Sequence, residues 1–293
     1  MVLGLGNSII YSPVPDSGYG ASASWDFDGT DDYINLGNAS NIKLTATDTS
    51  EGDGLTVSAW IKSSDWSLNA APYMYIISAY QYHSAGKGWY MAVTGSKLRV
   101  SIDTATGTIS MISGFRTFAQ SDGTEGAAPH FRASGWHHVS FTYDGRFFKM
   151  YIDGQLAQSG TNTLDAGSND NVIEYGSGNG NVDILIGADP GNLSGGVSGT
   201  SAATGTQWDG QITEVAMWNK ALDVDALDEI YEAVNTGGSV LDLSADSGSY
   251  NYSENLVGLW RASEVDGTTA VDTTGNNDGS IKNSLGTVSE VPS

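Results

Sequence analysis

The chain has 293 residues, a length that suits one large β-sandwich domain with a sizeable buried core. Its 34 acidic and 12 basic residues give a net charge of −22, which argues against nucleic acid as a partner because phosphates would be repelled. The absence of cysteine excludes disulfides, thiol catalysis and cysteine-ligated metals. No stretch approaches the about 20 apolar residues of a membrane span, and residues 1–10 lack the basic and apolar regions of an ordinary signal peptide.

Residues 1–21 contain two prolines and several glycines and are predicted to form an extended N-terminal arm. Residues 22–293 are predicted to form one domain, since no internal repeat divides them. At its start, Trp25 and Phe27 alternate with acidic residues, and Asp28-Gly29 predicts a turn between two short strands.

Four strand-length segments follow, with alternating apolar positions or many aromatic residues. They span residues 55–61, 73–82, 89–93 and 97–103. The last two are predicted to form a hairpin across Gly95-Ser96. Shorter strand-like fragments lie near residues 111–112 and 115–118.

Residues 136–157, WHHVSFTYDGRFFKMYIDGQLA, are predicted to form an antiparallel meander of three strands. Its joints are Asp144-Gly145 and Asp153-Gly154, and Asp-Gly favours a type I′ turn, which needs positive φ at both central residues. His137 and His138 are neighbours in one strand, so their side chains face opposite sides and cannot hold one ion together. One of them is expected in the core and the other at the surface.

Two loops rich in Gly, Asn, Ser and Asp, at residues 160–181 and 189–207, flank a buried strand at residues 182–186. A further strand is predicted over residues 208–218. Alternation along this strand predicts two faces, one with Ile212, Glu214 and Ala216 and the other with Val215 and Met217.

One helix is predicted over residues 223–235, with Asp223 or Asp225 as its N-cap and Gly237-Gly238 at its end. The 3–4 spacing of apolar residues predicts a buried face of Val224, Leu227, Ile230, Tyr231 and Val234. Beyond the helix, one strand at residues 256–261, a loop at residues 272–279 and a terminal segment are expected.

The order of these motifs resembles that of laminin-G-like, concanavalin-A-like domains over about residues 22–236. The stretches that carry the resemblance are residues 27–33, 55–61, 136–154, 184–187, 209–215 and 218–223. It implies an all-β fold in which two antiparallel sheets pack as a jelly-roll sandwich, with one short helix near an edge.

The C-terminal segment after the helix narrows the resemblance to one group of laminin-G-like proteins. Residues 256–260 and 272–279 look like a segment that usually precedes such a domain, but here they follow the helix. This arrangement resembles laminin-G-like proteins encoded by marine bacteriophages. It implies a non-catalytic protein on the virion surface, as capsid decoration, fibre or tail appendage, whose partners are other virion proteins, host-cell carbohydrate or further copies of itself. The alternatives are a carbohydrate-binding module of a bacterial cell-surface protein, which would be extracellular, and, third, a glucanase.

Catalysis is not expected. A retaining glucanase needs two carboxylates about 5–5.5 Å apart, supplied by acidic residues at alternate positions of one strand. The nearest pattern, Glu264-Val265-Asp266, lacks a third carboxylate and is expected beside a glycine turn rather than in a strand. A Gly-x-Ser-x-Gly nucleophile motif is also absent.

Sugar binding needs aromatic rings and a few polar groups on a concave face. Tyr80, Tyr82 and Trp89 lie on two neighbouring segments, with polar residues between them. Core packing is the alternative role for these rings, because aromatic residues dominate the cores of sandwiches. An exposed pair among the three is the best carbohydrate-binding candidate.

Calcium is the one cofactor that the sequence suggests, because carboxylates and amides on loops are its usual ligands. Asp189 and Asn192 follow the strand at residues 182–186, near the position where the resemblance to pentraxin-like relatives implies calcium-binding acids. Asp31 and Asp32 lie on another loop and are the second candidate pair.

Residues 272–279, DTTGNNDG, have the oxygen-bearing side chains of Asp272, Thr274, Asn276 and Asp278 at alternate positions, as at the start of an EF-hand loop. Asn277 stands where that loop needs glycine, and Asn283 stands where it needs a bidentate glutamate. The alternative is a turn in which these side chains accept hydrogen bonds from their own backbone.

Overall fold

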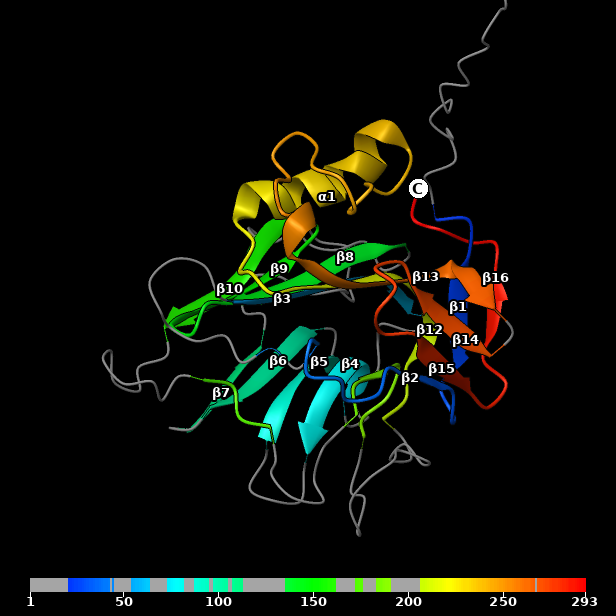
Figure 1. Cartoon of the computed structure of the whole chain (residues 1–293), viewed down its shortest axis with the longest axis horizontal. Helices are drawn as coiled ribbons and strands as arrows, with labels where there is room; N and C mark the ends of the chain where they lie inside the picture. Colours follow the sequence, from blue (N-terminus) through cyan, green and yellow to red (C-terminus); the bar gives the residue numbers. More distant parts are fainter. Residues whose placement is uncertain are drawn as a thin grey trace, which may run out of the picture.

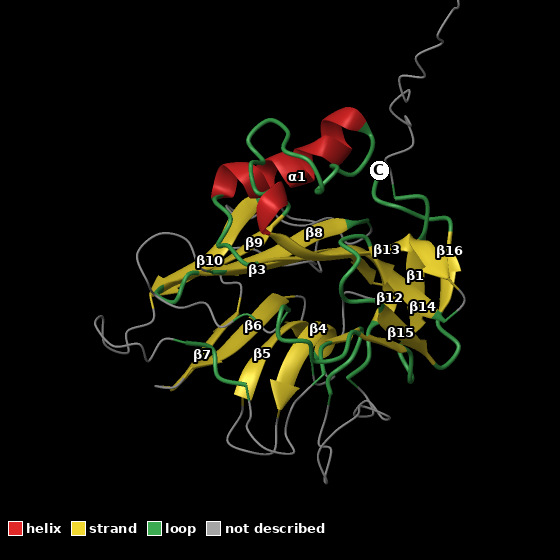
Figure 2. Ribbon diagram, in the orientation of Figure 1, coloured by secondary structure: helices red, strands yellow, loops and turns green. Residues whose placement is uncertain are grey.

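A computed structural model describes residues 21–42, 44, 54–63, 73–81, 87–94, 97–104, 107–112, 135–161, 172–175, 183–190, 206–266 and 268–293. These residues form antiparallel strands in two layers, with one α-helix on the outside of one layer (Figure 1, Figure 2). The predicted jelly-roll sandwich is confirmed. The Tyr82 and Asn192 predictions and most of the N-terminal arm lie outside the described residues.

The element bounds are β1 (Ser24–Asp28), β2 (Tyr33–Asn35), β3 (Leu55–Ser63), β4 (Met74–Gln81), β5 (Lys87–Thr94), β6 (Lys97–Thr104), β7 (Gly107–Ile112), β8 (His137–Tyr143), β9 (Phe147–Ile152), β10 (Gln155–Thr161), β11 (Leu185–Ile186), β12 (Asp209–Trp218), α1 (Val224–Gly237), the 3-10 turn η2 (Ser253–Asn255), β13 (Leu256–Asp266), β14 (Thr269–Asp272), β15 (Gly279–Lys282) and β16 (Gly286–Val288).

The two layers are parts of one hydrogen-bonded path. Its order is β10-β9-β8-β3-β12-β13-β14-β15-β2-β11-β4-β5-β6-β7, and β1 adds to β12 and pairs with β16. The strands β13, β14 and β15 carry the path from one layer to the other at one side of the sandwich (Figure 1). The main core lies between the layers, and its largest buried side chains include Trp25, Trp89, Phe141 and Trp260.

The predicted meander forms β8, β9 and β10, but its two turns differ. Asp153 and Gly154 have φ of 51° and 69°, so this joint has the positive φ at both positions that a type I′ turn requires. At the other joint only Gly145 has positive φ, and the Asp144 carboxylate accepts the backbone amides of Arg146 and Phe147. The type I′ prediction was therefore wrong for Asp144-Gly145, where a side chain organises a longer loop.

A bulge in β12 changes the predicted faces of that strand. Its pairing with β3 shifts between Thr213 and Ala216, and Glu214 in the bulge has φ of 50°. The extra residue reverses the alternation, so Ile212 lies in the main core together with Val215 and Met217. The prediction that Ile212 faces away from Val215 and Met217 was wrong for this reason.

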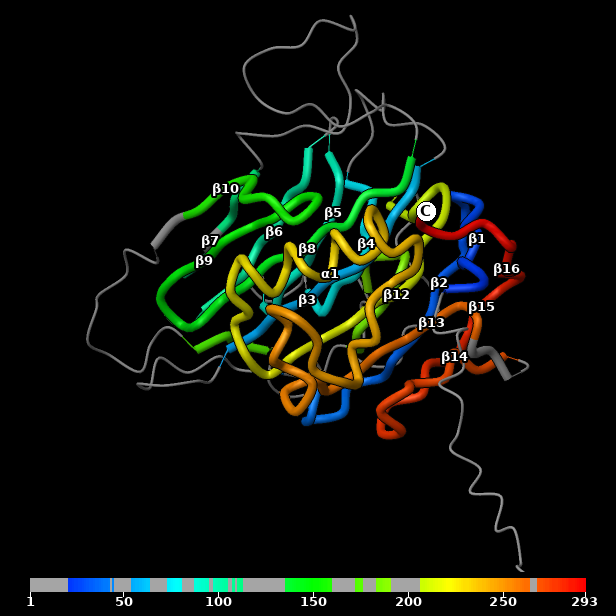
Figure 3. The backbone as a smooth tube through the Cα atoms, turned by 90° about the horizontal axis from the view of Figure 1, so that it is seen from above, coloured from blue at the N-terminus to red at the C-terminus, as the bar shows by residue number. Residues whose placement is uncertain are grey.

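Helix α1 covers the outer face of the β8–β3–β12 layer (Figure 1, Figure 3). Asp223 is the N-cap and accepts the amide of Ala226, while Gly238, with φ of 70°, ends the helix. Because the helix covers this face, every residue of β8 is buried, including both His137 and His138. The expectation of one surface histidine was wrong, and Val224 is exposed rather than part of the buried face.

The tail contributes more structure than the one predicted strand, since β13, β14, β15 and β16 all lie within it. Trp260 on β13 is fully buried, and its indole N–H donates to the carbonyl of Asn277 at 2.8 Å. The last strand, β16, pairs with β1, so that Ser24 faces Val288 across the ladder. The tail therefore completes the sandwich.

Candidate functional site

Four tyrosines gather on the outer face of the β4–β5 layer, away from the main core. Tyr75 and Tyr80 lie on β4, Tyr90 lies on β5, and Tyr73 immediately precedes β4. A register shift between Tyr75 and Ile77 adds one residue to β4. This bulge brings Tyr73 and Tyr75 to the same side as Tyr80, whereas strict alternation would place them on the opposite side. We call these four rings, together with Arg99, the tyrosine face.

Tyr90 is the centre of the tyrosine face. Its ring centroid lies 5.2 Å from those of Tyr75 and Tyr80 and 5.9 Å from that of Tyr73. Tyr75 and Tyr90 are buried, and Tyr73 and Tyr80 are half-buried. The arrangement has two partly accessible rings supported by two fixed ones, and contacts of this kind hold aromatic rings in place.

Arg99 on β6 fixes the positions of these rings. Its guanidinium lies 4.7 Å from the centroid of the Tyr73 ring. Its Nε donates to the Tyr90 hydroxyl at 2.9 Å, and its Nη2 donates to the Ser110 hydroxyl at 2.8 Å. A half-buried positive charge thus lies among the rings, in a chain whose net charge is −22.

Burial sets the protonation of the phenols in the tyrosine face. It raises the pKa of Tyr75 and of Tyr90 above the usual range, and the nearby Asp189 carboxylate raises that of Tyr75 further. Both hydroxyls therefore stay neutral at physiological pH and keep a proton to donate. Asp189, a predicted calcium ligand, is buried next to Tyr75, and the part of the chain that the structure describes gathers no three-residue metal cluster around it.

Two of the three predicted aromatic residues, Tyr80 and Trp89, do not share a surface. In the β4–β5 ladder Tyr80 faces Gly88, so the next residue, Trp89, points to the opposite side. Trp89 is 0% exposed, and its indole N–H donates to the Tyr175 hydroxyl at 2.8 Å. Of the three predicted aromatic residues, Tyr80 alone is both described and partly accessible. Reasoning from the sequence missed Tyr73, Tyr75, Tyr90 and Arg99, because the bulge that unites them is not visible in the pattern.

The loop between β1 and β2 brings the predicted pair Asp31 and Asp32 together with Asp28. One carboxylate oxygen from each of the three lies within 4.8 Å of the others. Asp28 and Asp31 are exposed and Asp32 is buried. The sequence pattern predicts only a turn at Asp28, although its spacing before Asp31 is a signal for this cluster.

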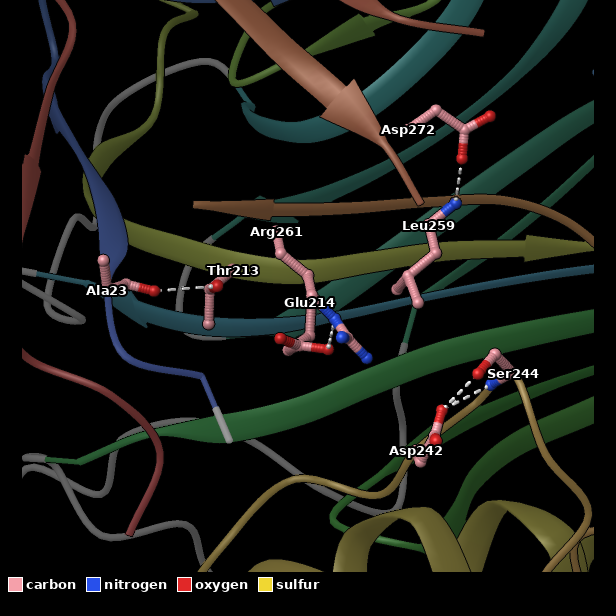
Figure 4. Close-up of polar contacts among 8 residues, drawn as sticks. All are labelled: Ala23, Thr213, Glu214, Asp242, Ser244, Leu259, Arg261 and Asp272. Carbon is pink, nitrogen blue, oxygen red and sulfur yellow. Dashed lines mark hydrogen bonds and ion pairs between the residues drawn. The ribbon is translucent and has the colours of Figure 1, made fainter. Parts of the chain in front are cut away.

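The loop after β14 is a turn rather than an EF-hand-like site. An oxygen of the buried Asp272 accepts a hydrogen bond from the amide of Leu259 (Figure 4). The two Asp272 oxygens also accept from the amides of Thr274 and Asn277, and Oδ2 accepts from the Thr274 hydroxyl. With its oxygens saturated by protein donors, Asp272 is not placed to bind a cation. The alternative prediction, a turn whose side chains accept hydrogen bonds from its own backbone, is confirmed.

The only stretch that resembled a glucanase motif lies in β13, which extends to Asp266. The expectation that Glu264-Val265-Asp266 lies outside a strand was therefore wrong. Earlier in β13, Arg261 donates from Nε to the Glu214 carboxylate at 3.1 Å, and both side chains are buried (Figure 4). This ion pair joins β13 to the bulge of β12.

The fold and these sites can be compared with known proteins. A family model described as Laminin_G_3, the concanavalin A-like lectin/glucanases superfamily, matches residues 28–227. The chain belongs to this laminin-G-like family. The match ends inside α1, so β13 to β16 lie beyond the part of the laminin-G-like domain that the family model covers.

Solved structures are similar to this laminin-G-like chain at low sequence identity. A Bacteroides ovatus protein, whose assignment to carbohydrate binding is itself provisional, superposes with a TM-score of 0.54 at 13% identity over 92% of this chain and 60% of its own. A Limulus polyphemus SAP-like pentraxin has a TM-score of 0.44 at 15% identity, and the superposition covers 72% of this chain and 82% of the pentraxin. The receptor-binding domain of botulinum neurotoxin D has a TM-score of 0.44 at 17% identity, and the superposition covers 72% of this chain and 43% of the neurotoxin chain. The chain thus spans 60% of the length of the Bacteroides protein.

A comparison with curated proteins finds no match. Among the described residues of this laminin-G-like chain, no helix is long and apolar enough to cross a membrane.

Proposed function

We propose that this laminin-G-like domain binds glycans without catalysing their cleavage, and that the tyrosine face is the binding surface. The observation that carries the proposal is the pair of partly accessible rings, Tyr73 and Tyr80, held by Tyr90 and Arg99 on one sheet face. Aromatic rings pack against the apolar faces of sugars, while hydroxyl and guanidinium groups donate hydrogen bonds. The opposite layer has its outer face covered by α1 (Figure 2).

The family supports the proposal but does not decide between binding and catalysis, because its description includes both lectins and glucanases. The Bacteroides ovatus structure, with its provisional assignment to carbohydrate binding, is in accord with the lectin alternative. A glucanase is the competing function. Release of reducing sugar from β-glucan by the purified full chain would overturn the non-catalytic proposal.

The binding test uses a panel of immobilised neutral and anionic oligosaccharides, followed by calorimetry with the tightest binder. We expect Tyr80→Ala to weaken binding about tenfold, the worth of one good aromatic contact. Phe147→Ala is the matched control, because it removes another aromatic side chain, 42% exposed, from the opposite layer. Binding that is lost equally in both variants, or no binding to any member of the panel, would contradict the assignment.

The setting that we propose is the virion surface, as capsid decoration, fibre or tail appendage, with a bacterial cell surface as the alternative. The order of the domain and its C-terminal segment supports the virion setting through its resemblance to phage-encoded proteins. Several copies on one particle, as single chains or as homo-oligomers, would compensate for weak single-site affinity. Purified particles should contain the chain at a fixed copy number. Recovery with cell envelopes alone would favour the alternative.

A further inference from the structure

Three carboxylates converge on the loop between β1 and β2. This loop crosses between the layers, because β1 pairs with β12 while β2 pairs with β11 and β15. Oxygens of Asp28, Asp31 and Asp32 lie within 4.8 Å of one another. None of the ion pairs among the described residues involves these three side chains. Their negative charges therefore face one another without a protein cation.

Asp32 is buried in this cluster, and one of its two oxygens lacks a hydrogen bond of normal geometry from the described residues. It is 4% exposed, and its Oδ2 accepts a long hydrogen bond, 3.3 Å, from the amide of Asp28. Its Oδ1 is buried and accepts no hydrogen bond of normal geometry from the described residues. A buried polar atom left unsatisfied costs about 1–3 kcal/mol, and more when it is charged, so native proteins normally supply a partner. Asp272, by contrast, is equally buried and has both of its oxygens occupied.

Burial and the neighbouring carboxylates act on Asp32 in the same direction. Burial raises the pKa of Asp32, and the neighbouring charges of Asp28 and Asp31 raise it further, while the amides of Asp28 and Ser284 oppose the shift.

The surrounding structure holds the loop in this shape. The Asn283 side-chain amide donates to the Asp31 carbonyl. A fourth acid, Asp209, faces Asp28 across the β1–β12 ladder, and a Cβ on Gly29 would lie 2.9 Å from its Cβ. Asp209 therefore lies against the loop and adds to the negative potential there.

We infer that Asp28, Asp31 and Asp32 bind one calcium ion, with Asp32 as the buried ligand that closes its inner side. The three oxygens lie within 4.8 Å of one another, and calcium, whose ligands lie at about 2.4 Å, can span separations of this size. Calcium also accepts irregular sets of six to eight oxygens, so water completes the shell beside the exposed Asp28 and Asp31. The site is independent of the glycan-binding proposal, because the tyrosine face contributes no ligand to it.

The test is calorimetric titration of the full chain, stripped with chelator, with calcium chloride and separately with magnesium chloride. We expect one calcium per chain, a rise in the melting temperature with calcium, and weaker binding of magnesium. Asp32→Asn should weaken calcium binding at least tenfold. The matched control is Asp26→Asn, which removes an exposed carboxylate two residues before Asp28 on the same strand and should bind as the wild type does.

The melting temperatures of the metal-free proteins distinguish a structural role of Asp32 from calcium ligation. Without calcium, Asp32→Asn should melt no lower than the wild type, because repulsion within the cluster is relieved. If Asp32→Asn fails to fold, the exposed Asp31→Asn gives the same reading, with reduced calcium binding. An absence of heat and melting shift with calcium, equal binding of magnesium, or equal losses in Asp26→Asn and the ligand variants would overturn the inference.

Discussion

His138 lies between β8 and helix α1 as a neutral, fully enclosed side chain. Its ring centroid is 5.4 Å from that of Trp60, and both of its ring nitrogens are buried without a hydrogen-bond partner among the described residues. Burial lowers the pKa of His138 to about 3. Protonation of the His138 ring therefore requires the interface between β8 and α1 to open.

The first prediction is a loss of stability in mild acid. Because the folded pKa of His138 lies below its unfolded value of about 6.5, its neutral form stabilises the fold above that pH, and the contribution is lost as pH falls toward 3, by up to about 1.4 kcal/mol per unit. Urea unfolding at pH 7, 6 and 5 should show a smaller loss in His138→Phe than in the wild type. Parallel pH profiles for the two proteins would contradict the prediction.

The second prediction concerns the buried pair of Glu214 and Arg261. Arg261→Met should destabilise the fold by about 3–5 kcal/mol, because it leaves the Glu214 carboxylate buried without its cationic partner. The double variant Glu214→Gln, Arg261→Met should be more stable than the single variant, because no uncompensated charge remains. Denaturant unfolding of the three proteins measures the coupling, and strictly additive losses would argue that the pair acts independently.

At the scale of elements, the turn between β9 and β10 controls how the meander meets helix α1. Gly154 has φ of 69°, and a Cβ on it would lie 2.5 Å from Asp228 Oδ1 and 3.1 Å from the Cα of Asp228 on the helix. Asp153 in the same turn contacts His137 Nδ1 at 2.9 Å and accepts the amide of His138. The turn thus has both a conformational and a packing requirement.

The third prediction separates these two requirements. Gly154→Ala combines left-handed strain with a clash, whereas Gly275→Ala, at φ of 80° with nothing within 4 Å, adds strain alone. We expect Gly275→Ala to cost about 1 kcal/mol and Gly154→Ala clearly more. Thermal melting measures the stability of both variants. Equal losses of stability would mean that α1 can shift at Asp228 without a cost in free energy.

Elements whose signals are local were predictable from the sequence. The Asp153-Gly154 turn, the Asp223 cap and the Gly238 end of α1 each depend on residues next to one another. The bulges of β4 and β12 were not predictable, because they are decided by pairing with β5 and β3. The tyrosine face was missed for the same reason, since one extra residue in β4 decides on which side Tyr73 and Tyr75 lie.

At the scale of the whole molecule, the tail closes the sandwich. In the β13–β15 region the ladder passes from one layer to the other, and Trp260 fills part of the core. The sequence suggested one strand here because β14, β15 and β16 are short and pair with distant partners, including β2 and β1. Their role is set by long-range contacts rather than by local pattern.

The fourth prediction is that deletion of residues 256–293 abolishes cooperative unfolding, although this whole segment lies outside the laminin-G-like match. Removal of β13 exposes the edge of β12 and opens the core at Trp260. The control is deletion of residues 289–293 alone, which removes the ion pair of Lys62 and Glu290 and the hydrogen bond from the Ser24 hydroxyl to the Glu290 carbonyl but no strand, and should cost far less. Circular dichroism during heating distinguishes the two, and a sharp native-like transition in the longer deletion would show that the tail is dispensable.

The pairing of β1 with β16 also makes the fold suitable for insertion into another protein. Because Ser24 and Val288 face each other across one ladder, the chain enters and leaves the domain about one strand spacing apart, about 4.8 Å. A carrier loop could accept the domain between two adjacent residues without being stretched. The same closeness would let the two ends be joined and new ends be opened elsewhere, as a circular permutant with the sandwich unchanged.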